Sequence, residues 1–343
     1  MVASFTHDVL IIGHGLAGAV LADRLLRRGL TVHVFDERKD LRASHVAAGI
    51  VNPISLRRDV LTWRAHQMLD TSRQHFQELD RRTGRTMWHP IELIKIFPTS
   101  NEALQWRRAM NSNAADLLSN KQQPTIDREC IRAPEGHGTV LQCAWVDLNA
   151  LIEAQRKHLR SENALSEEGV TETDIEEISG GVSVHGRTAP WVVHCKGPFH
   201  ELPGIVPVKG EVLTVKIPGL RLESILHRQI FLLPIGNEFF KLGSTFVWND
   251  VWTGPTLHAR EHLLGKLKEI IPHRIEVIDH QAGVRPAARD RRPLLGIIGE
   301  HRAVFNGLGA RGTLIAPWCA EHLIEHMFEG KPLDLEVDIS RFR

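Results

Sequence analysis

A Gly-x-Gly-x-x-Gly run near the N-terminus has the spacing of a loop that binds phosphate groups. It follows the apolar run Val9–Ile12, which predicts a buried strand, and it leads into a stretch with helical periodicity. The glycines allow a tight turn, the approach of a pyrophosphate and close packing of helix on strand. N–H groups at the helix start then hold the phosphates, helped by the helix dipole. The residues expected in this loop are Gly13, Gly15, Leu16, Ala17 and Gly18.

An acidic residue stands where the ribose of a dinucleotide would need it. Asp36 directly follows a second predicted strand, Thr31–Phe35, and lies 23 positions after Gly13. At about this spacing, the acid of a dinucleotide-binding fold meets a ribose hydroxyl. The alternative is an ordinary strand–turn–helix unit that binds nothing. The agreement of glycines, periodicity and acid favours the dinucleotide site.

Small residues after Asp36 indicate a loop that lies flat against a bulky planar group. The alternative is a tightly packed turn. The run Ser44–Pro53 resembles the flavin-contacting loop of D-amino-acid oxidases and their glycine oxidase relatives. This resemblance implies an FAD cofactor, with the loop along the isoalloxazine face. Its implied cofactor contacts are Ser44, His45, Ala47, Ala48 and Gly49.

A second run, Gly283–Gly296, is similar to the Gly-x-Arg-Pro…Asp-x-x-Pro-x-x-Gly pattern of the same superfamily. The resemblance gives Arg285 the role of binding the substrate carboxylate. A guanidinium suits that role, because it stays charged and matches a carboxylate with two parallel N–H bonds. Such a clamp would align the α-carbon of the substrate with the flavin. The alternative for Arg285 is a salt bridge at a domain seam.

The resemblance continues in the glycine-rich run Phe305–Trp318, which leads into a predicted helix through Met327. The family places this loop at the N1–C2=O edge of the flavin, where reduction leaves negative charge. N–H groups and a helix dipole there would stabilise the anion. The residues implied are Gly309, Arg311, Gly312 and Thr313.

The middle of the chain matches the superfamily less closely. The resemblance puts the backbone of Val170 beside the adenine and Gly197 close to the cofactor, although Cys195-Lys196 replaces the two small residues usual before that glycine. Lys241 stands where sarcosine-oxidase-like relatives carry a lysine that assists oxygen reduction. Glycine oxidases lack it, so a solvated lysine at a strand edge is the alternative.

The composition of the chain limits the partners and the compartment that we expect. The 343 residues carry a net charge of +1, so no overall field attracts nucleic acid or a membrane. Four scattered cysteines and no signal-peptide pattern favour the cytoplasm. We expect no metal site, because the His-x-x-Glu-His run at His322–His326 lies opposite the apolar stripe of its helix. The oligomeric state is unknown.

The order of predicted elements implies an α/β chain with two interleaved domains. The expected helices are 60–82, 101–119, 148–159 and 256–270, and Gln229–Pro234 with Phe239–Val247 predicts a β-hairpin. A Rossmann-like FAD-binding domain would comprise 1–55, 142–206 and 284–343. A substrate domain with a mixed or antiparallel sheet would comprise 56–141 and 207–283.

The resemblance predicts an enzyme that oxidises the C–N bond of an amino acid or N-substituted glycine. A hydride passes to non-covalent FAD, the imine hydrolyses, and oxygen or another acceptor takes the electrons, giving H2O2 with oxygen. The sequence contains no tyrosine, so no phenol holds the substrate. One alternative is an enzyme like the oxidase half of the bifunctional enzyme that trims carboxymethylaminomethyl uridine in tRNA, which the Gly-x-Arg-Gly pattern at 309–312 suits. Another is a flavin-binding protein without catalysis.

Overall fold

The computed structural model describes residues 5–120 and 130–342. The chain divides into two compact units, each built from separated stretches. Unit 1 comprises 1–45, 148–208 and 284–343, and unit 2 comprises 46–147 and 209–283. Among the described residues, no helix combines the length and apolar character needed to span a membrane. The assignment of cofactor and substrate to separate domains stays a prediction.

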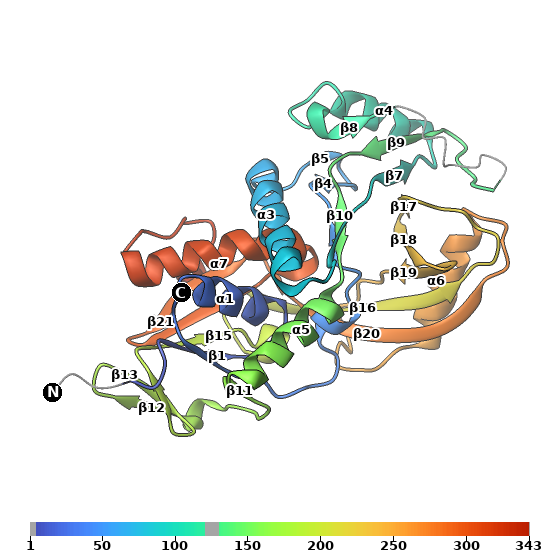
Figure 1. The fold of residues 1–343 in the computed structure, drawn as a ribbon. Helices are drawn as coiled ribbons and strands as arrows, with labels where there is room; N and C mark the ends of the chain where they lie inside the picture. The colour runs from blue at the N-terminus through green and yellow to red at the C-terminus, as the bar shows by residue number, and fades with distance from the viewer. Residues whose placement is uncertain (1–4, 121–129, 343) are drawn as a thin grey trace. The chain divides into compact units, whose positions relative to one another are not determined.

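Unit 1 is built on a six-stranded sheet in the order β11-β2-β1-β15-β22-β21. All neighbours in this sheet are parallel except β21 and β22 at one edge. The main elements are β1 (Val9–Ile12), α1 (Leu16–Arg27), β2 (Val32–Phe35), α5 (Leu148–Ser161), β11 (Leu165–Ser166), β15 (Trp191–His194), β21 (Leu294–Gly299), β22 (Arg302–Asn306) and α7 (Gly312–Glu329). This is the Rossmann-like sheet that the sequence predicts (Figure 1).

A small antiparallel sheet covers one face of the parallel sheet. Leu10, Ile12 and Val192 share a face and pack with Val182 and Val184 of the small sheet. Helix α1 contacts both α5 and α7. The remaining elements of unit 1 are α2 (Ala43–Val46, whose last residue belongs to unit 2), η2 (Glu172–Asp174), β12 (Ile175–Ile178), β13 (Gly181–Val184), β14 (Arg187–Ala189), η3 (Gly197–Phe199), η4 (Gly309–Arg311) and η5 (Ile339–Phe342).

Unit 2 is built on an eight-stranded mixed sheet in the order β20-β16-β19-β18-β17-β7-β9-β8. Its long strands β16 (Ile205–Lys216) and β20 (Glu276–Ala288) carry the chain from one unit to the other. Leu263 and Leu267 of α6 (Leu257–Lys268) pack on the buried face of this sheet. The other strands are β7 (Leu93–Ile96), β8 (Leu118–Ser119), β9 (His137–Val140), β17 (Ile225–Arg228), β18 (Ile230–Gly236) and β19 (Phe239–Gly243).

Smaller elements complete unit 2. A three-stranded sheet has the order β3-β10-β6, a two-stranded one joins β4 and β5, and α3 contacts β6. Their bounds are β3 (Ile50–Val51), β4 (Ile54–Ser55), β5 (Val60–Leu61), α3 (Ala65–Thr83), β6 (Trp88–Pro90), α4 (Ser100–Ala109), η1 (Ala115–Leu117) and β10 (Ala144–Val146).

Most predicted elements are confirmed, and two helix predictions need correction. The predicted hairpin forms, because β18 and β19 pair antiparallel. The helix expected over 60–82 begins only at Ala65, since Val60 and Leu61 pair with β4. The helix expected over 101–119 ends at Ala109, whose carbonyl accepts a hydrogen bond from the Ser112 hydroxyl (2.7 Å). A serine that bonds nearby backbone competes with helix continuation.

Candidate active site

The glycine loop of unit 1 is held by close backbone packing. Gly13 has φ +98°, and a Cβ there would lie 2.6 Å from the carbonyl oxygen of Cys195. A Cβ on Gly18 would lie 1.9 Å from the carbonyl oxygen of Gly13. Both distances are below any ordinary contact, so only glycine fits at either position. These two glycines perform the turn and the helix–strand packing that the spacing predicts.

The first turn of α1 favours an anion. Its N-cap is Gly15, which has no side chain to accept from the helix N–H groups, and the first turn carries no acidic residue. The N–H of Leu16 donates to the hydroxyl of Ser44 (2.9 Å). Ser44, expected to contact a cofactor, therefore lies directly at this loop. Unsatisfied N–H groups at a helix start attract phosphate.

Helix α7 begins beside the start of α1. A Cβ on Gly312 would lie 2.8 Å from Cδ2 of Leu16, so the two helix ends are in contact. The first turn of α7 also contains no acidic residue, and its N-cap Arg311 provides no capping hydrogen bond. In unit 2, α4 and α6 are capped by the hydroxyls of Thr99 and Thr256, whereas α3 has no side-chain cap. Two helix dipoles thus direct positive ends to one part of unit 1.

Asp36 has partners that sequence reasoning did not find. The N–H of His14 donates to Asp36 Oδ1 (2.8 Å), and Nη1 of the fully buried Arg156 donates to Asp36 Oδ2 (2.5 Å). Arg156 comes from the buried face of α5, next to Gln155, which bonds His14 Nε2 (2.8 Å). These bonds fix the carboxylate beside the glycine loop, and the ribose contact of Asp36 stays a prediction.

Arg285 lies on β20, in a part of unit 1 where several of the segments expected to contact the cofactor come together. The N–H of Val284 donates to the carbonyl of Leu41 (2.8 Å). Pro286 approaches Gly197 and Ala287 approaches Gly309, with distances of 4.0 and 3.9 Å from a Cβ built on each glycine. Desolvation lowers the pKa of Arg285 to about 10. A guanidinium that has lost hydration binds an anion favourably.

The glycine-rich loop before α7 carries a second arginine of the same kind. Desolvation, with a smaller effect from Arg291, lowers the pKa of Arg311 to about 10. Thr313 is buried in the first turn of α7, two residues further on. The residues that the resemblance implies in this loop therefore lie together at the start of α7.

Two predicted contacts from the middle of the chain lie near each other in unit 1. The carbonyl of Val170 accepts a hydrogen bond from Lys196 Nζ (3.1 Å). The carbonyl of Gly197 accepts one from the buried Asn306 side chain (2.9 Å). Lys196 thus reaches the backbone expected beside the adenine, a link that the sequence did not indicate.

His45 joins α2 to α5 within unit 1. Its Nδ1 lies 3.0 Å from Asn149 Oδ1, and its carbonyl accepts from Asn149 Nδ2 (3.2 Å).

In unit 2, Gly49 has φ +69°, and a Cβ there would lie 2.0 Å from the carbonyl oxygen of Val146. Packing against β10 therefore explains Gly49 within this unit. Ala48 is buried beside it and Ala47 is exposed.

Lys241 differs from the solvated strand-edge lysine given as the alternative. It lies on β19, which has β16 and β18 on its two sides, and it is half-buried. Its Nζ donates to the carbonyl of Ala47 (3.4 Å) in the predicted flavin-facing loop. Desolvation lowers the pKa of Lys241, opposed by the charge of Asp147. The alternative of a lysine at a strand edge is wrong, because β19 lies between two other strands of its sheet.

The family model described as FAD dependent oxidoreductase matches residues 8–326. The chain belongs to this family. This FAD dependent oxidoreductase is 23% identical to the tRNA 5-methylaminomethyl-2-thiouridine biosynthesis bifunctional protein MnmC of Marinobacter nauticus, covering 98% of this chain and 58% of the relative. The corresponding protein of Aeromonas hydrophila is 25% identical, with 97% and 57% covered. The chain thus spans less than two thirds of these relatives.

Solved structures share the fold of this FAD dependent oxidoreductase. Iminodiacetate oxidase from Chelativorans sp. BNC1 superposes with a TM-score of 0.78 at 20% identity, covering 97% of this chain and 98% of that one. Glycine oxidase from Geobacillus kaustophilus gives 0.79 at 22% identity, covering 98% and 97%. Membership implies FAD. The glycine loop, the two helix starts and the Asp36 carboxylate fit its pyrophosphate and ribose.

Proposed function

We propose that this flavoprotein oxidises the C–N bond of an amino acid, and in particular of an N-substituted glycine. The observation that carries the proposal is the position of Arg285, whose neighbours Pro286 and Ala287 approach Gly197 and Gly309 in a unit where the starts of α1 and α7 meet. Helix starts suit the phosphates of a dinucleotide, and a guanidinium suits the carboxylate of an amino acid. The names of the relatives support the narrower class, since iminodiacetate is an N-substituted glycine.

Unit 1 supplies most of the cofactor contacts in this proposal. The loop from Gly13 to Gly18, with Ser44, holds the pyrophosphate, and Asp36 accepts a ribose hydroxyl. The bound FAD supplies the electron acceptor for a hydride from the carbon that bears the amine. Arg311, Gly312 and Thr313 place N–H groups and a helix dipole where negative charge develops.

Arg285 aligns the substrate. Its fork binds both carboxylate oxygens and so fixes the α-carbon, which turns an encounter into an oriented reaction. An amine that binds uncharged needs no side-chain base. Water then hydrolyses the imine to an amine and an oxo acid or aldehyde.

The cofactor is held without a covalent bond in this proposal. Burial raises the pKa of the thiols of Cys143, Cys195 and Cys319, so these side chains stay protonated. A protonated thiol is a poor nucleophile. Release of intact FAD on mild denaturation, leaving a colourless protein, is the expected result.

Oxygen is the proposed electron acceptor, and Lys241 the residue that assists its reduction. A half-buried ammonium favours the negative charge that oxygen acquires when it is reduced. A Lys241→Met variant should bleach with substrate at the wild-type rate without oxygen but recover its yellow colour at least about tenfold more slowly when oxygen is added. Equal recovery in both proteins would remove Lys241 from the mechanism.

A tRNA-borne substrate is the second candidate. The curated relatives that support it match 97–98% of this chain, and carboxymethylaminomethyl uridine also carries an N-substituted glycine. Binding to tRNA should weaken steeply with salt, because phosphate contacts release counterions. A free amino acid, bound through one carboxylate, should show only a shallow dependence.

Reconstitution followed by anaerobic reduction tests the proposed function. The purified protein is loaded with FAD, and its absorbance is followed as iminodiacetate, N-methylglycine, glycine, D-alanine or modified tRNA is added. We expect bleaching by at least one N-substituted glycine or by the modified tRNA. FAD uptake without bleaching by any of them would favour a flavin-binding protein without catalysis.

A further inference from the structure

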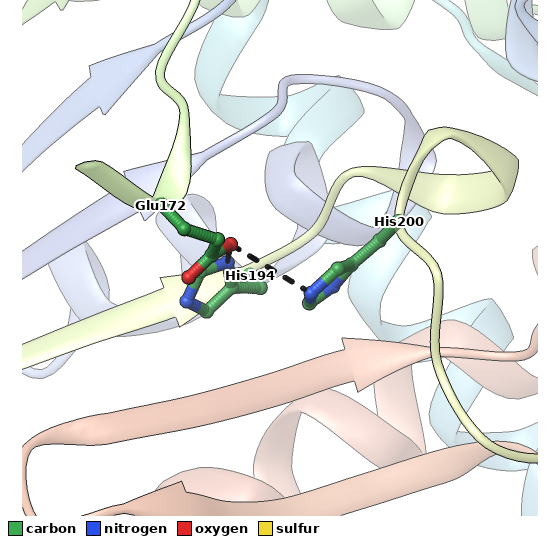
Figure 2. Close-up of side chains that lie close together, drawn as sticks. All are labelled: Glu172, His194 and His200. Carbon is green, nitrogen blue, oxygen red and sulfur yellow. Dashed lines mark ion pairs between the residues drawn. The ribbon is translucent and has the colours of Figure 1, made fainter. Parts of the chain in front are cut away.

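Two histidines and a glutamate converge in unit 1 at the end of β15 (Figure 2). His194 is the last residue of β15, Glu172 begins η2, and His200 follows η3. Glu172 Oε1 lies 3.8 Å from His194 Nδ1 and 4.0 Å from His200 Nε2. One donor atom from each side chain lies within 4.8 Å of the others. Three separate segments thus direct donor atoms to one point.

His194 is the unusual member of this cluster. Its side chain is fully buried, and among the described residues neither ring nitrogen has a hydrogen-bond partner. The Nδ1 atom of His200 also has no partner within the described chain. Burying polar atoms without partners costs free energy, and native proteins rarely leave them so. The buried imidazole of His194 therefore indicates a ligand that the protein atoms do not supply.

Glu172 is oriented toward the histidines by an arginine. Arg302 Nη1 donates to Glu172 Oε2 (3.2 Å), and Arg302 Nε donates to Glu177 Oε1 (2.7 Å). The second oxygen of Glu172, Oε1, faces the two rings. A partner that fixes the far oxygen of a carboxylate is typical of groups that orient metal ligands.

We propose that Glu172, His194 and His200 bind a divalent transition-metal ion, with Zn²⁺ as the ion of choice. Two imidazoles and one carboxylate form a donor set that zinc accepts, with water as the fourth ligand. In a tetrahedral zinc site, the ligand atoms lie about 3.3 Å from one another. The donor atoms of the three side chains must therefore approach one another by no more than about 1.5 Å. Glu172 can make much of this movement, since its side chain is 57% exposed.

Lys196 opposes the ion. Its Nζ lies 3.9 Å from Glu172 Oε1, on the same oxygen that faces the histidines. A nearby cation raises the free energy of a bound divalent ion. A Lys196→Met variant should therefore bind Zn²⁺ more tightly than the wild type, as expected for an ion held close to the Lys196 ammonium.

Zinc titration of the FAD-loaded, tag-free protein tests the site. Calorimetry should give one Zn²⁺ per chain, and Co²⁺ should add absorption at wavelengths longer than the flavin bands. His200→Gln and Glu172→Gln should each weaken Zn²⁺ binding by more than about 100-fold, beyond the 10–100-fold loss typical of an outer-shell partner. Glu172 and His200 are preferred to His194 for substitution, because the His194 side chain is the most buried of the three.

His185→Gln is the matched control. His185 lies in the same unit, with Nδ1 3.2 Å from Glu168 and Nε2 3.7 Å from Asp174. Zinc binding should be unchanged in this variant. Absence of stoichiometric Zn²⁺ binding by the wild type, or equal binding by the His200→Gln/Glu172→Gln double variant, would overturn the proposal. The zinc readouts do not depend on turnover, so they also separate this inference from the proposed oxidase function.

Discussion

The carbonyl oxygen of Gly13 lies 1.9 Å from the position that a Cβ on Gly18 would occupy. The turn after β1 and the first turn of α1 are therefore in backbone contact. No side chain can be inserted there without moving the helix away from the sheet. The same movement would displace the N–H groups of α1 from the proposed pyrophosphate site.

Gly18→Ala should lower the free energy of unfolding by several kcal/mol and reduce the FAD content of the purified protein. The reason is overpacking against backbone, which cannot rotate away. Chemical denaturation and the ratio of flavin to protein absorbance measure the two effects.

Gly265→Ala is the matched control for a glycine-to-alanine change inside a helix. Gly265 lies in α6, and a Cβ there would meet nothing within 4 Å. The substitution should stabilise the protein by about 1 kcal/mol through helix propensity. If both variants change stability in the same direction, the packing argument for Gly18 is wrong.

Arg156→Met should destabilise the protein by about 3–5 kcal/mol, because it leaves the buried Asp36 carboxylate without its cationic partner. The double variant Arg156→Met/Asp36→Asn should recover much of that loss, since no charge then remains buried. A double-mutant cycle by urea denaturation measures the coupling. Additive effects of the two substitutions would contradict the ion pair.

Buried histidines should make the protein less stable in mild acid. Burial lowers the pKa of His227 to about 4, with a smaller effect from Lys95. Between pH 6.5 and 4 the unfolded chain therefore binds a proton that the folded chain does not, and stability falls as pH falls through this window. The slope for one such histidine approaches about 1.4 kcal/mol per pH unit.

His227→Gln should remove this contribution from the slope measured by urea denaturation from pH 6.5 to 4. His262→Gln changes an exposed histidine of α6 in the same unit and serves as the control. Identical slopes for wild type and His227→Gln would show that His227 is not buried in its neutral form.

Local spacing in the sequence predicted much of the fold and the glycine loop. Gly13 and Gly18 could be recognised because the turn and the packing they allow involve neighbours close in sequence. Arg156 could not be paired with Asp36, which lies 120 residues away. Its position among the apolar residues of α5, at helical spacing, was the available signal.

The order of strands in a sheet, and clusters of side chains from distant parts of the chain, could not be predicted from the sequence. Lys241 was weighed as an edge lysine because the sequence does not state that β19 lies between β16 and β18. His194 was not considered as a ligand, because Glu172 and His200 reach it only when η2, β15 and η3 come together. The expectation of no metal site rested on helical His pairs, and His322 Nε2 instead accepts from the N–H of Asp334 (2.9 Å).

The central claim is that Arg285 binds the carboxylate of the substrate oxidised with FAD. Anaerobic stopped-flow reduction of wild type and Arg285→Ala, each loaded with FAD, tests it with the best N-substituted glycine and with the same amine lacking its carboxylate. With the acid as substrate, the second-order rate constant of flavin reduction should fall roughly 100-fold or more in Arg285→Ala, which is equivalent to about 2.7 kcal/mol. With the plain amine, this rate constant should change little. Equal rates for the two proteins with the acid would contradict the account.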